Sequence, residues 1–155
     1  MARDAFDFAT VTMAALGSGL GIFNAWRTWV NDRVRIRVAV SRLIATDGQR
    51  AIGIEVVNLS AFDVTITHIG FDLVGTSDHL QLFKPLIAQG HALPKRLEPR
   101  AAFTVFQPLS AFEGKQLLQL DRAYVATACG LRPKSRRGSV AKLDLVAFAG
   151  RQTVD

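Results

Sequence analysis

Residues 63–75 read DVTITHIGFDLVG, a run in which apolar and polar residues alternate but the alternation changes phase once. The apolar residues form two sets of opposite parity, Val64 with Ile66 and then Ile69, Phe71 and Leu73. Successive side chains of a strand point to opposite faces, so one face holds residues of a single parity. The run therefore predicts a strand with a β-bulge near Thr67 and His68 that resets the phase.

The same two-residue period recurs on both sides of this run, separated by turn signals such as Thr46-Asp47-Gly48-Gln49. The expected strands lie at 34–41, 52–57, 64–73, 80–83, 102–106, 123–128 and 140–148. The last of these, VAKLDLVAF, is also compatible with a helix. Ser110 and Glu113 fit a capping box, which predicts a short helix ending near Leu118. Residues 76–92 are less regular, and Pro94 and Pro99 bracket an exposed connection.

About seven short strands without β-α-β alternation predict a mainly β chain. We expect an antiparallel immunoglobulin-like β-sandwich preceded by one N-terminal α-helix. The expected boundaries are residues 1–31 for the helix, 32–149 for the sandwich and 150–155 for a tail. The length of 155 residues suffices for one such domain, and 49% hydrophobic residues supply its core. The single cysteine, Cys129, excludes an intrachain disulfide.

The glycines of Leu16-Gly17-Ser18-Gly19-Leu20-Gly21 are typical either of a phosphate-binding loop or of a helix with a small-residue face. A dinucleotide fingerprint requires G-x-G-x-x-G after a strand, and here Ile22 takes the place of the last glycine. A P-loop requires a following Lys, and none occurs before Lys84. The helix is therefore the better interpretation. Its Gly17-x-x-x-Gly21 pattern predicts a helix-packing face for self-association, although small residues are also simply tolerated in membrane helices.

No charged residue occurs from Phe8 to Trp26, a length of about 28 Å of helix, close to the thickness of a hydrocarbon core. The flanking residues Trp26, Arg27, Trp29 and Arg33 are typical of a membrane anchor. The excess of arginine after the helix predicts a single-pass inner-membrane protein whose β domain faces the cytoplasm. Three alternatives stay open: an interfacial helix, a cleaved signal peptide, and a helix packed in a soluble core.

The sequence shows no catalytic constellation, and we expect no catalytic residue, no cofactor and no metal. The three histidines lack metal-binding spacing, and Asp78-His79 is more typical of a solvated loop. Cys129 is expected to be a half-buried structural thiol. Asn58-Leu59-Ser60 is a formal glycosylation sequon, but a cap of a hairpin turn is the preferred interpretation.

The basic loop 132–137 carries four cations that are candidates for contact with an anionic partner: Arg132, Lys134, Arg136 and Arg137. Anionic lipid headgroups are one candidate partner. Nucleic acid is not an expected partner, because no aromatic residue and no groove-entering helix accompanies the charges. A solvated hairpin loop is the alternative without a binding function.

The stretch IEVVNLSAFDVTITHIGFDLVG resembles a group of small, uncharacterised bacterial proteins with an N-terminal membrane helix and one immunoglobulin-like β-sandwich. The matching features are an Asn turn, a V-T-I-x-x-[IV]-G-F run and a proline-containing segment: Asn58, Val64-Thr65-Ile66, Ile69-Gly70-Phe71, Leu93-Pro94 and Leu97-Glu98-Pro99. The resemblance covers roughly residues 20–128 and implies an architecture but no activity. The chain departs from the pattern at Ser60 and Arg100, where such proteins often carry Gly.

These observations predict a membrane-anchored interaction or accessory module that is not an enzyme. Its expected partners are the membrane, an unknown protein and, through the N-terminal helix, further copies of itself. The net charge of +6 agrees with an acidic partner without choosing one. The alternative is a soluble basic β protein that binds nucleic acid or self-assembles as an accessory subunit.

Overall fold

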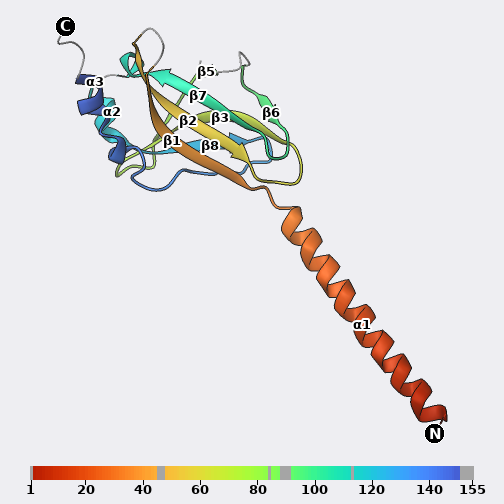
Figure 1. Ribbon diagram of the computed structural model, residues 1–155. Coiled ribbons are helices and arrows are strands. Elements are labelled where there is room, and N and C mark those ends of the chain that lie inside the picture. Colours follow the sequence, from red (N-terminus) through yellow and green to blue (C-terminus); the bar gives the residue numbers. More distant parts are fainter. Residues whose placement is uncertain (1, 45–47, 84, 88–91, 113, 151–155) are drawn as a thin grey trace. The chain divides into compact units, whose positions relative to one another are not determined.

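The computed structural model describes residues 2–44, 48–83, 85–87, 92–112 and 114–150, with side chains undescribed at 2–12, 30, 31, 114, 115 and 150. The chain divides into two compact units, residues 1–33 and 34–155. The first unit consists of helix α1, Ala2–Asn31, and the second, which we call the β domain, contains the strands (Figure 1).

The described part of the β domain contains eight strands and four short helices. The strands are β1 (Ile36–Ile44), β2 (Arg50–Asn58), β3 (Val64–Leu73), β4 (His79–Gln81), β5 (Leu86–Ile87), β6 (Lys95–Leu97), β7 (Ala102–Pro108) and β8 (Leu120–Thr127). The helices are η1 (Leu109–Ala111), α2 (Gly114–Gln119), η2 (Ala141–Leu143) and α3 (Leu145–Gly150). Helices α2 and α3 lie side by side at one end of the domain (Figure 1).

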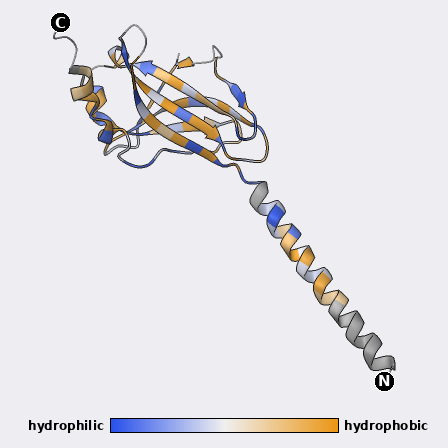
Figure 2. Cartoon of the chain, in the orientation of Figure 1, coloured by the Kyte–Doolittle hydropathy of each residue, from blue (hydrophilic) through white to orange (hydrophobic). Residues whose placement is uncertain are grey.

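The strands form two antiparallel sheets. One sheet has the order β1-β2-β7-β5, and in the other β3 pairs with β4 and β6 along one edge and with β8 along the other. The prediction of a mainly β chain with an N-terminal helix is therefore confirmed. Alternating hydropathy along the strands is visible in Figure 2, and the apolar faces of both sheets form one core. Phe71 of β3 is fully buried there, and its ring meets the edge of Phe112 at a centroid distance of 6.0 Å.

The predicted bulge in β3 is confirmed. The register between β3 and β8 shifts between Ile66 and His68. Because of this shift, Ile66 and Ile69 both lie fully buried in the core despite their opposite parity. Each buried isoleucine stabilises the fold by about 1.5–3 kcal/mol relative to an exposed one, which explains why the irregular residue is accommodated in the strand.

Asn58, at the end of β2, is fully buried and joins three segments through its side chain. Its Nδ2 group donates to the carbonyl oxygens of Phe62 at 2.8 Å, Leu97 at 2.9 Å and Glu98 at 3.1 Å. Its Oδ1 accepts a hydrogen bond from the Ser60 amide at 2.9 Å. The Asn58 amide thus fixes the β2–β3 turn against the end of β6, a role more extensive than the predicted turn cap.

The chain departs from the resembled proteins at Arg100 and Ser60, and the structure shows a different local environment at each position. Arg100 has φ 64, in the left-handed region that glycine adopts most easily. Ser60 is buried, and its hydroxyl accepts a hydrogen bond of 2.8 Å from the Arg35 amide. A glycine could replace Arg100 without strain, whereas at position 60 it would remove a bond that holds the start of β1.

Several predicted elements were wrong or incomplete. Residues 140–148 form no strand, because η2 and α3 occupy this segment. The short strands β5 and β6 were not predicted, and Leu97 of β6 is buried rather than part of an exposed connection. The predicted helix near Leu118 is present as η1 followed by α2, but the proposed capping residue Glu113 lies outside the described residues.

The prediction of a membrane-spanning helix was wrong, and so was the single-pass inner-membrane localisation with a cytoplasmic β domain. None of the helices, as far as the structure describes them, combines the length and the apolar content that crossing a bilayer requires. The physical reason is that absence of charge is not the same as apolarity. Three glycines together with Ser18 and Asn24 lower the hydropathy of the central helix even though it lacks charged residues.

Candidate functional site

The densest polar cluster of the described residues lies on the outer face of the β3–β8 sheet, around Asp72. Arg122 Nε lies 3.0 Å from Asp72 Oδ2, and Lys134 Nζ lies 2.8 Å from the same oxygen. Arg132 contacts Oδ1 at 3.3 Å. The Asp72 side chain is only 14% exposed, whereas the three cations are each about one-third exposed. We call these four residues the Asp72 cluster.

Strand pairing brings the Asp72 cluster together. Arg122 of β8 lies directly opposite Asp72 of β3 in the register. Residues 131–135 run along the other edge of β8, where the amides of Val125 and Thr127 donate to Pro133 and Leu131. An isolated bridge between Tyr124 and Lys134 belongs to the same pairing. The segment thereby carries Arg132 and Lys134 to a carboxylate about 60 residues away in sequence.

Tyr124 of β8 forms the apolar part of this surface. A side chain added at Gly70 would lie 2.8 Å from the Tyr124 ring and hydroxyl, so the tyrosine packs across the bare glycine. The Arg132 guanidinium covers the ring at 3.5 Å from its centroid, and His79 approaches it edge-on at 5.6 Å. Burial beneath these groups raises the pKa of Tyr124. Tyr124 therefore serves as a neutral stacking platform at physiological pH.

The electrostatics of the cluster favour an ionised Asp72. Burial alone would raise the pKa of the Asp72 carboxyl, but hydrogen bonds from Lys134 and Arg122 and the charges of Lys134 and Arg132 outweigh it and lower the pKa. Three cations share one carboxylate, and Arg132 Nε is buried without a hydrogen-bond partner. The arrangement contains no nucleophile beside a base, and its geometry fastens residues 131–135 to the sheet.

The four predicted anion contacts fall into two pairs. Arg132 and Lys134 turn onto Asp72, so their charges are largely engaged within the chain. Arg136 and Arg137 are exposed, with no ion pair to any described side chain. The sequence analysis did not predict Asp72 and Arg122 as members of this site. Local spacing could not reveal their pairing, because the two residues lie in separate strands.

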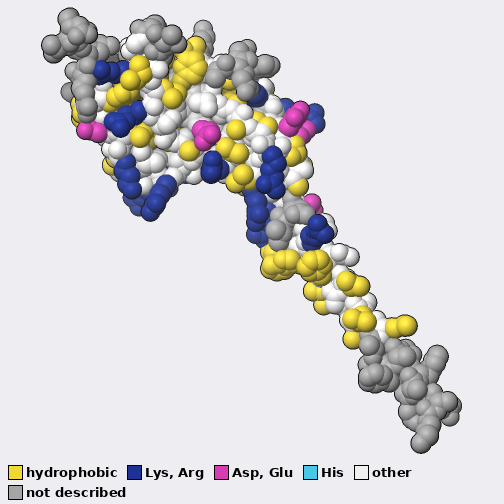
Figure 3. Space-filling view, in the orientation of Figure 1, with side chains coloured by type: hydrophobic (Ala, Val, Ile, Leu, Met, Phe, Trp, Pro, Cys, Tyr) yellow, Lys and Arg dark blue, Asp and Glu magenta, His cyan; other side chains and the backbone are white. Residues whose placement is uncertain are grey.

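Helix α1 carries a row of exposed apolar side chains. Met13, Leu16, Leu20 and Phe23 recur at spacings of three, four and three residues and are between 59% and 74% exposed. Residues with this spacing lie on one side of a helix. We call these four residues the α1 seam; hydrophobic side chains line the helix in Figure 3.

Four of the predicted helix residues lie outside the α1 seam: Gly17, Gly21, Trp26 and Trp29. Arg33 follows the end of the helix. A side chain added at Gly17 or Gly21 would meet no atom within 4 Å, so no contact within the chain requires glycine there. Trp26 and Trp29 pack at a centroid distance of 5.8 Å, and the Arg33 guanidinium lies 3.7 Å over the Trp29 ring. Arg27 is exposed and occupies the next position of the seam after Phe23.

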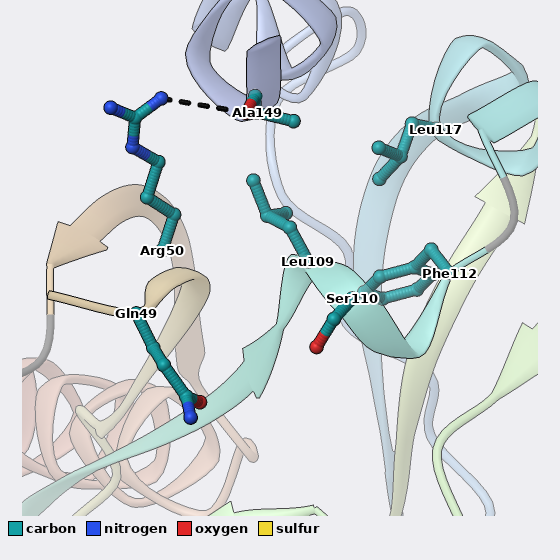
Figure 4. A pocket seen from close by; sticks show the side chains of 7 residues that line it. All are labelled: Gln49, Arg50, Leu109, Ser110, Phe112, Leu117 and Ala149. Carbon is teal, nitrogen blue, oxygen red and sulfur yellow. Dashed lines mark hydrogen bonds between the residues drawn. The ribbon is translucent and has the colours of Figure 1, made fainter. Parts of the chain in front are cut away.

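A pocket of about 450 Å³ opens near the end of the β domain where α2 and α3 lie (Figure 4). Apolar side chains of Leu109, Phe112 and Leu117 line part of the pocket. Ser110 also lines it, and its hydroxyl points away from the Leu117 side chain. Arg50 donates to the carbonyl oxygens of Phe148 and Ala149, which ties β2 to α3. The described lining residues include no acid, histidine or cysteine.

The remaining candidate residues do not assemble into a site. Cys129 is exposed, which corrects the expected half-buried thiol. The His68 ring nitrogen Nδ1 lies 3.1 Å from the hydroxyl of its neighbour Thr67, and His91 lies outside the described residues. Among the residues that the structure describes, no group of three His, Cys, Asp or Glu side chains is placed to hold a metal ion.

No protein-family model matches the chain, and no curated protein matches it.

Proposed function

We propose that this chain is a non-catalytic accessory module that assembles with a second copy of itself through the α1 seam, while its β domain presents a surface for another partner. The observation that carries this proposal is the seam itself. Met13, Leu16, Leu20 and Phe23 are all more than half exposed on a helix that forms its own compact unit. Contiguous exposed apolar surface of this kind marks interaction sites.

The energetics of α1 favour a partner. An isolated helix gains little from propensity alone, and most helical stability in proteins comes from packing an apolar face. Gly17, Gly19 and Gly21 each lower helix stability by about 1 kcal/mol relative to alanine. Burying one leucine of the seam stabilises an assembly by about 1.5–3 kcal/mol, so two such residues per helix offset the three glycines.

A second copy of α1 fits the seam, and the fit is best when the helices run antiparallel. In that orientation Met13 faces Phe23 and Leu16 faces Leu20 of the other helix, so every seam residue meets an apolar one. A parallel pair would instead place the two Arg27 side chains together at the end of the seam, and like charges repel. The antiparallel pair is a two-fold symmetric interface, the commonest kind in oligomers.

The Gly17–Gly21 face is the less favoured contact. Small-residue faces drive association where no hydrophobic force acts between helices, as in lipid. In water the hydrophobic effect acts on the larger seam side chains. The seam therefore supplies the stronger driving force.

Sedimentation equilibrium of the full chain tests the proposal. We expect a dimer at micromolar concentration for the unaltered chain and a monomer for L16E/L20E. The matched control A14E/S18E adds the same two charges at the same spacing on another side of the helix and should remain dimeric. A monomeric unaltered chain at about 100 µM, or dissociation by the control alone, would overturn the proposal.

Two further variants test the geometry of the pair. The double variant M13E/F23K places opposite charges together in an antiparallel pair and like charges together in a parallel pair, so we expect it to dimerise. A monomeric M13E/F23K contradicts the antiparallel arrangement. G17A/G21A should remain dimeric, and loss of the dimer in that variant would move the interface to the glycine face.

We also propose that the two sheets form a sandwich of immunoglobulin-like type. Two antiparallel sheets that share one core of residues such as Ile54, Phe71 and Val125 support this assignment. An experimental structure of the β domain tests it through the strand order and the angle between the sheets.

A further inference from the structure

Strand β1 has one edge paired with β2 and one open edge. It is the last strand of its sheet, and all nine of its residues are in register with β2. The backbone N–H of Asn58 donates to the carbonyl oxygen of Ala101 on the β7 side, whereas the backbone N–H of Leu59 donates to the carbonyl oxygen of Arg35 on the β1 side. Hydrogen bonding alternates along an antiparallel pair, so the backbone groups of Ile36, Val38, Val40 and Arg42 point away from β2. Within the described part of the chain, none of these backbone groups has a partner.

The other edge strands are shorter, or their outer edge is already paired. Strands β4, β5 and β6 contain only two or three residues each. The outer edge of β8 is covered by residues 131–135, whose backbone exchanges hydrogen bonds with Ala123, Val125 and Thr127. Open strand edges are templates for pairing with another segment. Among the described strands, β1 is therefore the one long template.

The side chains around the open edge are strongly basic. Arg35 and Arg37 project from the outer face at the start of β1, and Arg42 is exposed near its end. Glu55 is the only acidic residue of β1 and β2, and it lies 3.8 Å from Arg37 with both side chains largely exposed. Basic side chains outnumber acidic ones on the face of the β domain drawn in Figure 3. The inner side of β1 is apolar, with Val38 buried and Val40 half-buried.

We infer that the open edge of β1 binds an extended acidic segment of a partner protein by strand addition. The backbone of the segment pairs with residues 36–42. Side chains of a strand alternate between faces, so every second residue of the segment lies beside Arg35 and Arg37 and is acidic. The residues between them lie beside Val38 and Val40 and are apolar. The ligand class is thus a peptide in which acidic and β-branched residues alternate.

Charge argues against a second β1 strand as the occupant. Two copies of β1 paired with each other would bring arginines of both copies onto one face. Like charges opposite each other destabilise a strand pair, whereas opposite charges stabilise it. This inference goes beyond the proposed self-assembly, because it uses a surface of the β domain that α1 does not contribute.

Amide hydrogen exchange and titration of the full chain with an acetylated, amidated nine-residue peptide of alternating Glu and Val test the inference. We expect binding with protection of the Ile36, Val38 and Val40 amides. The corresponding Lys/Val peptide should not bind. A Glu/Val peptide N-methylated at alternate residues, on the edge that would face β1, should also fail. Equal binding of the N-methylated peptide, or binding without protection of these amides, would overturn the inference.

Matched variants separate the edge from general electrostatics. R35E/R37E should weaken binding by about tenfold, because two surface ion pairs with the peptide are lost and each contributes about threefold in affinity. R136E/R137E changes the net charge equally on an exposed loop and should bind as the unaltered chain does. Weakening by both variants to the same extent would show non-specific attraction and refute the inference. Protection of the β1 amides that rises with protein concentration without peptide would show self-pairing and refute it too.

The variant L16E/L20E keeps the two proposals apart. Its α1 seam is disrupted, but its β1 edge is unchanged, so we expect it to bind the Glu/Val peptide with the affinity of the unaltered chain. Loss of peptide binding in this variant would contradict the inference that β1 suffices. A monomeric unaltered chain that binds the peptide would refute the self-assembly alone.

Discussion

Replacement of the buried Asn58 by alanine is expected to destabilise the β domain by about 3–5 kcal/mol. The substitution removes one hydrogen bond from each of four backbone groups: the carbonyls of Phe62, Leu97 and Glu98 and the amide of Ser60. The Glu98 carbonyl keeps its bond from the Ala101 amide. The Leu97 carbonyl and the Ser60 amide are in fully buried bonds, and each buried group without a partner costs about 1–2 kcal/mol. The two partly buried carbonyls reach water more easily and add about 0.5 kcal/mol each.

Urea unfolding of the full chain at pH 7, monitored by far-UV circular dichroism, measures this loss of stability. N24A is the matched control, because Asn24 is exposed on α1 and alanine is a better helix former there. We expect N24A to leave the unfolding of the β domain unchanged. A loss below about 1 kcal/mol for N58A would refute the reasoning that the four bonds hold the β2–β3 turn to β6.

The isosteric variant N58D adds a dependence on pH. Its second carboxyl oxygen would face three carbonyl oxygens, which raises the pKa of the new carboxyl above its unfolded value of about 3.9. A raised folded pKa means that stability is greatest below the unfolded value and falls as the pH rises through the folded value. We expect N58D to approach the unaltered chain near pH 4 and to differ most at pH 7. A difference that does not change between these pH values would contradict the bonding assigned to Nδ2.

Two further substitutions test the sheet that carries the Asp72 cluster. G70A should destabilise by about 3 kcal/mol, because its new methyl group would overlap the backbone oxygen of Leu80. In G53A the nearest atoms to the new methyl group belong to the movable Leu43 and Ser41 side chains, so this control should cost less than about 1 kcal/mol in the same urea titration. D72N should destabilise by about 2 kcal/mol at pH 7, a value reduced for the partial exposure of the three cations. Because the folded pKa of the Asp72 carboxyl is lowered, its contribution is complete above about pH 4 and is lost as the pH falls through the folded value, so the two chains should converge in acid.

Elements with a long two-residue period were predictable from the sequence. The strands β1, β2 and β3 each contain nine or ten residues, and the phase change in β3 indicated the bulge between Ile66 and His68. The strands β5 and β6 were not predictable, because their two or three residues are defined by pairing with β7 and β3 rather than by a local pattern. The segment 140–148 is compatible with both periods, and tertiary packing of Leu145 in the core selects the helix.

The candidate surfaces were predictable only in part. The basic residues Arg132 and Lys134 were visible as a charge run, but their engagement with Asp72 depends on a strand pairing that no local spacing reveals. The α1 seam was not predicted, because the sequence analysis placed the helix-packing face at Gly17 and Gly21. The membrane-spanning interpretation of the same helix was wrong because it weighed missing charge above the many small and polar residues.

The segment 131–135 also limits the stoichiometry of any strand addition. It occupies the outer edge of β8, and the Asp72 cluster fastens it there. Among the described strands, β1 is then the one long edge available: a segment paired with β1 finds no equally long open edge on the opposite sheet to continue the pairing. For long strands the described domain is therefore monovalent. Loss of the Asp72 carboxylate would then do more than lower stability. It would loosen the cover of β8 and turn a monovalent domain into a divalent one, able to form chains of domains rather than a closed complex.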